Sequence, residues 1–227
     1  MNIETLIKPL SNLYNEKRDQ NILAQIEKVL HEYILQTPND YEAFLRLAIT
    51  IFSQTNNRED EAIEVLQMIP PTSIWYAKSA LIEAYMQEEV TQIDQSLCKK
   101  LLALQTPDNE IKSMKYYMTS SYFIYRNEQT YQYMLKKSVK LCNKHVWNLV
   151  TLARIYRIYD TNKCKMLICD ALDNIEFVGF GHKPDEDITN VDYFIKSYIS
   201  GVYLTTFNFK DIINDLRPVP HKMPWEK

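Results

Sequence analysis

Apolar side chains recur every three or four residues along most of this chain, and proline-containing turns interrupt them. This spacing indicates amphipathic helices. The turn LQTPND at 35–40 returns as LQTPDN at 104–109, with Pro38 and Pro107 69 residues apart. A third proline turn, IPPT at 69–72, lies close to the midpoint. The sequence therefore predicts helices that are grouped into units of about 34 residues.

Each predicted unit is a helix, a polar turn and a second helix. The polar stretch SQTNNRED at 53–60 separates two helical stripes. Asn39 is expected to cap the helix after the first proline turn, with Glu42 reaching back in a capping box. Asp108 or Thr106 is expected to do the same after the later turn. The stripes around 53–60 are Phe44, Leu47, Ala48, Ile51 and Phe52, then Ala62, Ile63, Leu66 and Ile69.

The composition favours an all-α protein and excludes several classes. Only 3 of 227 residues are glycine, whereas Rossmann, P-loop and β-rich folds use glycine in their tight turns. With 46% hydrophobic residues the chain can bury a core, and its net charge of −3 gives no general basis for nucleic-acid binding. The richness in Ile, Asn, Lys and Tyr is typical of an AT-rich, for example bacterial, genome.

We expect a cytoplasmic protein. The first 20 residues show no basic leader followed by an apolar core, and no apolar run approaches the length of a membrane span. The four cysteines form no CxxC pair and are expected to be reduced core thiols. They are Cys98, Cys142, Cys164 and Cys169.

The period and the fine pattern resemble those of tetratricopeptide repeats. Phe44, Leu47, Ala48 and Ile51 match the large and small positions of that family's first helix, and so do Leu149, Leu152, Ala153 and Tyr156. The resemblance covers roughly residues 20–176 and implies a right-handed α-solenoid of antiparallel helix pairs. Repeat units are expected to start near residues 41, 74, 112 and 146, after an N-terminal helix pair. The alternative is an irregular helical domain.

The sequence pattern changes after residue 176. Residues 176–187 contain two of the three glycines and predict a loop. An aromatic helix is expected at 188–207 and a short helix around FKDIINDL, before a proline-containing tail. Residues 1–176 are thus interpreted as the repeat array, and 177–227 as loop, helical cap and tail, with 188–216 covering the apolar end of the array.

No pattern for catalysis or cofactor binding is found. HExxH, GxSxG, GxxxxGK[ST] and GxGxxG are absent, and the four histidines show no metal-ligand spacing. His182 beside Asp185–Asp187 is interpreted as a solvated loop in which Asp185 or Asp187 caps the next helix. The adjacent Glu88 and Glu89 are interpreted as a solvated helix end. We therefore expect no enzyme activity, no cofactor and no metal.

The family resemblance implies a concave groove that binds an extended peptide through the first helix of each unit. The groove positions carried over are Glu42, Leu45, Ile49, Phe52, Trp75, Lys78, Ile82, Tyr85, Ser113, Tyr116, Ser120, Phe123, Trp147, Val150, Arg154 and Arg157. We expect the main contacts from aromatic and basic members of this set, which suit an acidic partner. These are Phe52, Trp75, Lys78, Tyr85, Tyr116, Phe123, Trp147, Arg154 and Arg157. The alternative is that these aromatic residues belong to the core and that Arg154 and Arg157 lie on a solvated helix face.

Three functional hypotheses remain. The first is a non-catalytic protein-interaction module that binds a peptide or protein. The second is a dedicated inhibitor, such as an immunity protein, or a chaperone of one toxin or secreted protein. The third is an enzyme of unrecognised type or a single-strand nucleic-acid binder. The stacking surface for a nucleic acid would comprise Tyr116, Tyr117, Tyr122, Tyr125, Arg126, Tyr131, Tyr133, Lys136 and Lys137.

Overall fold

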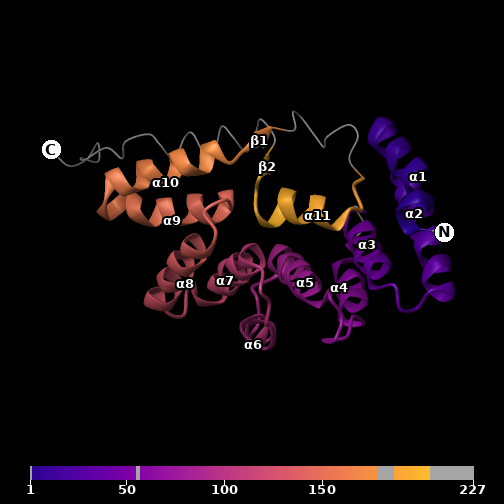
Figure 1. Ribbon diagram of the computed structural model, residues 1–227, viewed down its shortest axis with the longest axis horizontal. Coiled ribbons are helices and arrows are strands. Elements are labelled where there is room, and N and C mark those ends of the chain that lie inside the picture. The colour runs from indigo at the N-terminus through magenta and orange to yellow at the C-terminus, as the bar shows by residue number, and fades with distance from the viewer. Residues whose placement is uncertain (1, 55–56, 178–186, 205–227) are drawn as a thin grey trace.

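The computed structural model describes residues 2–54, 57–177 and 187–204, and within them the protein is almost entirely helical (Figure 1). Ten α-helices follow one another and pack in adjacent pairs, which confirms the all-α prediction. The pairs are α1 (Ile3–Lys17) with α2 (Gln20–Gln36), α3 (Tyr41–Phe52) with α4 (Glu59–Gln67), α5 (Tyr76–Val90) with α6 (Gln95–Ala103), α7 (Asn109–Phe123) with α8 (Glu128–Leu141), and α9 (Val146–Tyr159) with α10 (Thr161–Asp173).

Polar side chains at the helix starts explain most of these boundaries. Asp108 accepts hydrogen bonds from the backbone N–H groups of Glu110 and Ile111, which confirms it as the N-cap of α7. The predicted capping box at Asn39 is wrong. Asp40 stands at the cap of α3 and makes no cap bond, because its carboxylate accepts the Tyr33 hydroxyl at 2.8 Å.

The buried apolar residues form two clusters. The larger one joins α1 to α7 with the C-terminal helical segment, and includes the fully buried Leu23, Leu45 and Leu81. The smaller one joins α8, α9 and α10 around Leu149 and Ile168. The two halves of the helix array therefore have largely separate cores.

The C-terminal segment differs from its prediction. Helix α11 (Val191–Phe194) continues as a π-helix (Ile195–Ile199), and β1 (Glu176–Phe177) pairs in parallel with β2 (Tyr203–Leu204). Helical structure ends before Gly201, which has a φ of 70°, so the predicted helix at 188–207 is too long. The helix expected around FKDIINDL and the tail lie outside the described residues.

Two further expectations about this segment are corrected. Asn190, rather than Asp185 or Asp187, caps α11 by accepting the backbone N–H of Tyr193. The described part of the predicted cap, residues 188–204, does not cover the end of the array, and residues 205–216 lie outside the described residues. The described part lies against α3 and α5, in the middle of the array and on the side opposite α6 (Figure 1).

Candidate protein-binding surface

An aromatic cluster holds α11 against α3 and α5, on the face where a partner was expected. Phe194 is 1% exposed, and its ring centroid lies 6.2 Å from that of Phe52 and 5.7 Å from that of Tyr85. Tyr198 adds contacts at 4.7 Å to Phe194 and 5.8 Å to Tyr85. Burial raises the pKa of both tyrosines, that of Tyr198 to about 12. At Phe52 and Tyr85 the chain's own segment therefore takes the place predicted for a partner.

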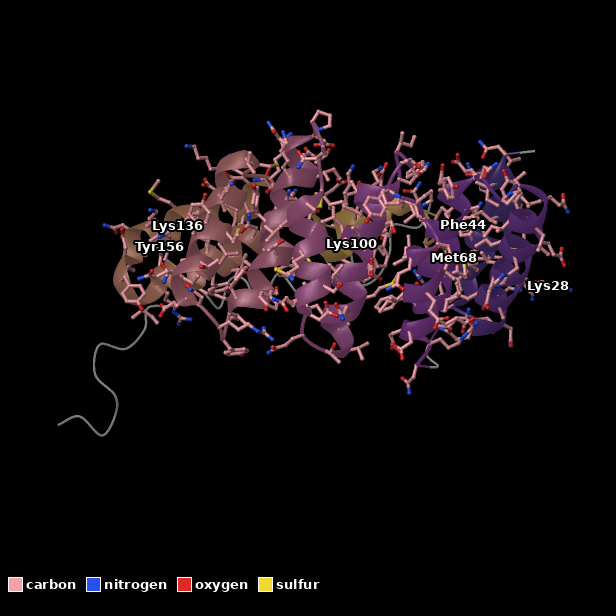
Figure 2. The ribbon with its side chains drawn as sticks, turned by 90° about the horizontal axis from the view of Figure 1, so that it is seen from below. Lys28, Phe44, Met68, Lys100, Lys136 and Tyr156 are labelled. Carbon is pink, nitrogen blue, oxygen red and sulfur yellow. The ribbon has the colours of Figure 1, made fainter. Side chains whose placement is uncertain are left out.

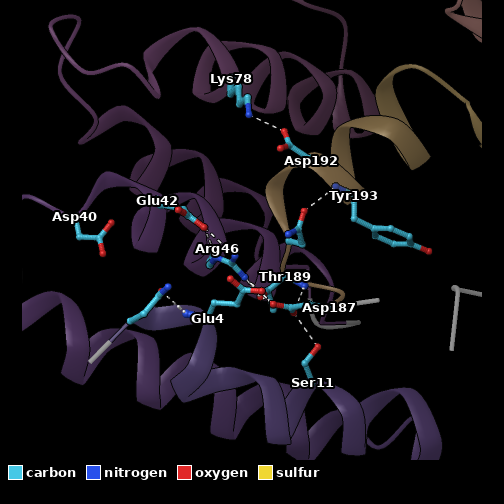
Figure 3. Close-up of polar contacts among 12 residues, drawn as sticks. Glu4, Ser11, Asp40, Glu42, Arg46, Lys78, Asp187, Thr189, Asp192 and Tyr193 are labelled. Atoms are coloured by element: carbon cyan, nitrogen blue, oxygen red, sulfur yellow. Dashed lines mark hydrogen bonds and ion pairs between the residues drawn. The ribbon is translucent and has the colours of Figure 1, made fainter. Parts of the chain in front are cut away.

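A buried arginine fixes the start of the segment (Figure 3). Arg46 is 2% exposed and donates to the carboxylates of Glu42 at 2.9 Å and Asp187 at 2.6 Å. Asp187 also accepts the Ser11 hydroxyl at 2.8 Å, which ties α1 into the same network. A guanidinium this deeply buried is stable only with such paired carboxylates. Arg46 was not among the predicted groove residues.

Lys78 contacts both the Trp75 ring and the C-terminal segment. The Lys78 ammonium lies 2.6 Å from the Asp192 carboxylate and 5.0 Å from the Trp75 ring centroid. The Lys78 and Asp192 side chains remain 26% and 66% exposed. The positive charge predicted to attract a partner at Lys78 is thus matched within the chain.

Trp147 is covered by the turn that follows the π-helix. Its backbone N–H donates to the Ser200 carbonyl at 3.3 Å. A Cβ atom at Gly201 would lie 2.7 Å from the Trp147 ring, so only glycine permits this approach. Trp147 therefore contacts the chain's own segment as well.

Helix α7 presents different residues from those predicted. The Lys137 ammonium of α8 lies 4.3 Å from the Tyr116 ring centroid and lowers the Tyr116 pKa through a hydrogen bond. Tyr116 therefore faces α8, and the next residue, Tyr117, lines a cavity between α5, α7, α8 and α9. Phe123 packs edge-to-face on Tyr122, with centroids 5.0 Å apart.

A cavity of about 360 Å³ lies between α5, α7, α8 and α9. Glu88 accepts a hydrogen bond from Ser121, and the surrounding protein raises the Glu88 pKa although the side chain stays accessible through the cavity. Burial and the Glu88 charge raise the Tyr117 pKa to about 12, and both effects raise the Tyr131 pKa. The lining residues are Glu88, Thr91, Gln92, Ile93, Tyr117, Ser120, Ser121, Ile124, Tyr125, Tyr131 and Thr151.

The two predicted arginines lie on α9. Arg154 is exposed and Arg157 is half-buried. The Arg154 charge opposes the upward pKa shifts of Tyr117 and Tyr131, which places its guanidinium near the cavity tyrosines. None of the nine predicted contact residues lines the cavity itself, and Arg154 acts on it through its charge.

A serine and a histidine meet in the interior without forming a catalytic pair. Ser113 Oγ lies 3.1 Å from His145 Nδ1 and 2.9 Å from Ser138 Oγ, and it also donates to the Ser138 carbonyl. Both Ser113 and His145 are buried, at 0% and 4% exposure. Burial lowers the His145 pKa to about 4, so the ring is neutral near pH 7. This network joins α7, α8 and α9 and leaves the hydroxyl without access to a substrate.

Charge is divided unevenly along the array. Residues 1–108 contain 9 Lys and Arg against 16 Asp and Glu, whereas residues 109–175 contain 11 against 5. Every ion pair that we identify among the described residues involves α1–α6 or the α11 segment. Apart from Arg154 and Arg157, the cations of α7–α10 have no carboxylate within 4.0 Å among the described residues.

Several of these cations lie over tyrosine rings instead. Lys163 lies 4.2 Å and Lys136 5.7 Å from the Tyr156 ring centroid, and both lower its pKa (Figure 2). Lys137 lies between Tyr116 and Tyr133 in the same way. The result is a basic and aromatic surface over α8 and its neighbours.

No described helix combines the length and apolarity needed to span a bilayer. In the described part of the chain no three His, Cys, Asp or Glu side chains gather as metal ligands. The cysteines are free thiols, but only Cys98 and Cys164 are buried. Cys142 is half-buried and Cys169 is exposed, so the expectation of four core thiols is correct for two.

Comparisons with known proteins give no relative. No family model, no curated protein and no solved structure matches the chain.

Two features were missed from the sequence although it contained a signal for each. Counting charges by segment rather than over the whole chain reveals the basic α7–α10 half. The acidic Asp187 and Asp192, followed by the aromatic Phe194 and Tyr198, could have suggested a segment complementary to the aromatic and basic residues of the predicted groove. The cavity tyrosines carry no such signal, because their convergence depends on how three hairpins stack.

Proposed function

We propose that the protein is a non-catalytic interaction module, a tetratricopeptide-like right-handed solenoid that binds a peptide or protein segment at the cavity on its concave side. The observation that carries this proposal is that the same face already binds a helix of the chain itself through aromatic contacts. One turn further along α5 from Tyr85, Glu88 lines an open cavity together with residues of α7, α8 and α9.

The cavity suits an aromatic or aliphatic anchor with polar contacts at its rim. Tyr117, Tyr125 and Tyr131 offer apolar area at small entropy cost, and hydroxyl groups of Ser120 and Thr151 offer hydrogen bonds. Tyr125 is 81% and Ile124 is 41% exposed, as expected for residues that a partner covers. A cavity of about 720 Å³ is larger, but it lies between the proline turns at the edge of the array, near Pro71 and Pro107.

Site-specific photo-crosslinking tests the proposal. A benzophenone amino acid at Tyr125 is expected to capture one protein from a native lysate, identified by mass spectrometry. The same group at Leu35, which is 84% exposed on α2, serves as the control and should capture none. Adding Tyr131→Ala should reduce capture at residue 125 at least tenfold, since hot-spot tyrosines contribute about 2 kcal/mol or more. Equal capture at both positions, or indifference to Tyr131→Ala, would contradict the proposal.

The identity of the captured protein distinguishes the kinds of module. A single stoichiometric toxin or secreted protein favours a dedicated inhibitor or chaperone, and several weak partners favour a general adaptor.

The basic and aromatic surface over α8 supports a second candidate, single-strand nucleic-acid binding. Lysines beside tyrosine rings can track a phosphate backbone while the rings stack on bases. Fluorescence anisotropy with a labelled 20-nucleotide strand should then show binding that weakens steeply with salt. A flat titration at 50 mM salt would remove this candidate.

A further inference from the structure

The second helices α4, α6 and α8 form one exposed layer of the molecule. They lie along the edge opposite α11 in Figure 1. Each carries or ends at a large apolar residue that is exposed to solvent. Met68 at the end of α4 is 63% exposed, Leu102 on α6 is 38% exposed and Tyr133 on α8 is 57% exposed. These residues give the layer some exposed apolar area.

The two ends of this layer have opposite charge. At one end, α4 exposes Asp60 and Glu64. At the other end, α8 exposes Lys136 and Lys140, which have no carboxylate partner among the described residues. Figure 2 views the molecule from this side and shows Met68 and Lys136 on either side of Lys100 of α6.

We propose that this layer is the interface between two copies of the chain, packed antiparallel so that α4 of each copy lies against α8 of the other. A twofold axis near α6 brings the acidic α4 of each copy to the basic α8 of the other copy. The same contact therefore forms twice, and the surface is complementary to itself. The exposed Met68, Leu102 and Tyr133 supply apolar contact beside these charges.

A second copy is favoured over a foreign acidic protein because the chain itself supplies both charges. Residues 1–108 have 7 more acidic than basic residues, and residues 109–175 have 6 more basic than acidic ones. Antiparallel packing places these two halves opposite each other, whereas parallel packing would place like charges together. Lys99 of α6 is exposed near the axis, where it would lie close to Lys99 of the second copy, and the two like charges repel. The attraction therefore comes from the outer helices.

Complementary charge reversal tests this arrangement. Variant one carries Lys136→Glu and Lys140→Glu, and variant two carries Asp60→Lys and Glu64→Lys. All four positions are exposed, so both variants are expected to fold, which circular dichroism checks. In sedimentation velocity at 50 mM salt the wild type should be a dimer, and each variant alone a monomer, because its α4 and α8 then carry like charge.

Mixing the two variants is the decisive step. In a mixed pair the acidic α8 meets a basic α4 and the basic α8 meets an acidic α4, so a heterodimer should form. Its dissociation constant should lie within about tenfold of the wild-type value, and 500 mM salt should weaken both. The matched control Lys8→Glu/Lys17→Glu, at exposed positions of α1, should remain dimeric.

Three outcomes would overturn the proposal. If the wild type is monomeric at 200 µM protein and 50 mM salt, the layer is no dimer interface, and a foreign acidic partner of α8 becomes the better explanation. Dimers that persist in each variant alone would place the interface elsewhere. Monomeric variants that fail to associate on mixing would exclude the antiparallel arrangement.

Discussion

The two halves of the helix array are stabilised in different ways. In the closed half, α1–α7, helices α3 and α5 pack against the C-terminal segment, residues 187–204. Ion pairs connect neighbouring elements of this half. In the open half, α8–α10, the core is made by α8 and the α9–α10 hairpin, and a buried polar network joins this core to α7. Apart from Arg154 and Arg157, the cations of α7–α10 have no carboxylate within 4.0 Å among the described residues. Hairpins of one general design can therefore form either a closed groove or an open one.

The two halves differ in whether another segment covers their aromatic residues. Where Phe194 and Tyr198 cover Phe52 and Tyr85, aromatic groove residues become core. Where no described segment fills the space, Tyr117 and Tyr131 line a cavity. The same residue types thus serve stability in one half and are proposed to serve binding in the other.

Replacing Phe194 by Ala should destabilise the closed half, and this effect should be the largest of those predicted. The ring is buried among three other aromatic rings, so its loss should reduce the free energy of unfolding by about 4 kcal/mol. Urea denaturation followed by circular dichroism gives this value. Hydrogen exchange should speed up in α3 and α5 and stay unchanged in α9 and α10. Tyr125→Ala, at an exposed position, should cost less than about 0.5 kcal/mol.

Acid should destabilise the open half at a higher pH than the closed half. Unfolded His145 binds a proton near pH 6.5, but folded His145 does so only near pH 4, so stability falls between these values by about 3 kcal/mol in total. In the closed half Arg58 lowers the pKa values of Glu27 and Glu61, and the stability they add is lost only below their ordinary value of 4.5. Urea midpoints of the wild type and His145→Gln from pH 7 to 4 check this. Parallel pH profiles of the two proteins would refute it.

Gly201→Ala should separate the C-terminal segment from the open half. The added methyl group meets the Trp147 ring, and alanine at a φ of 70° is strained, so a loss of about 2 kcal/mol is expected. Thermal unfolding measures the loss, and tryptophan fluorescence should shift as Trp147 becomes more exposed. Val202→Ala, at the next residue, is the control and should cost less than about 1 kcal/mol. A variant as stable as the wild type would mean that the turn moves freely away from α9.

The Lys78–Asp192 ion pair should contribute least to the free energy of unfolding. Both side chains are partly exposed, so a double-mutant cycle with Lys78→Ala and Asp192→Ala should give a coupling below about 1 kcal/mol that shrinks in salt. A coupling above about 2 kcal/mol would mean that charge, rather than aromatic packing, holds α11 in place.

The sequence by itself determined the helices, their order and most of their ends. These features follow from contacts three or four residues apart and from capping side chains such as Asp108, which act within one turn. The capping prediction failed at Asn39 because Tyr33, on the preceding helix, engages the Asp40 carboxylate. A partner seven residues away already lies beyond what a local cap pattern predicts.

Only the tertiary structure decided which groove residues are covered. Arg46 and Asp187 are 141 residues apart, and their pairing places α11 on α3 rather than at the end of the array. The orientation of α7, which turns Tyr116 to α8 and Tyr117 to the cavity, is set by packing against both neighbouring hairpins. Helical periodicity fixes which residues share a face, but the choice of what that face meets depends on burial summed over distant segments.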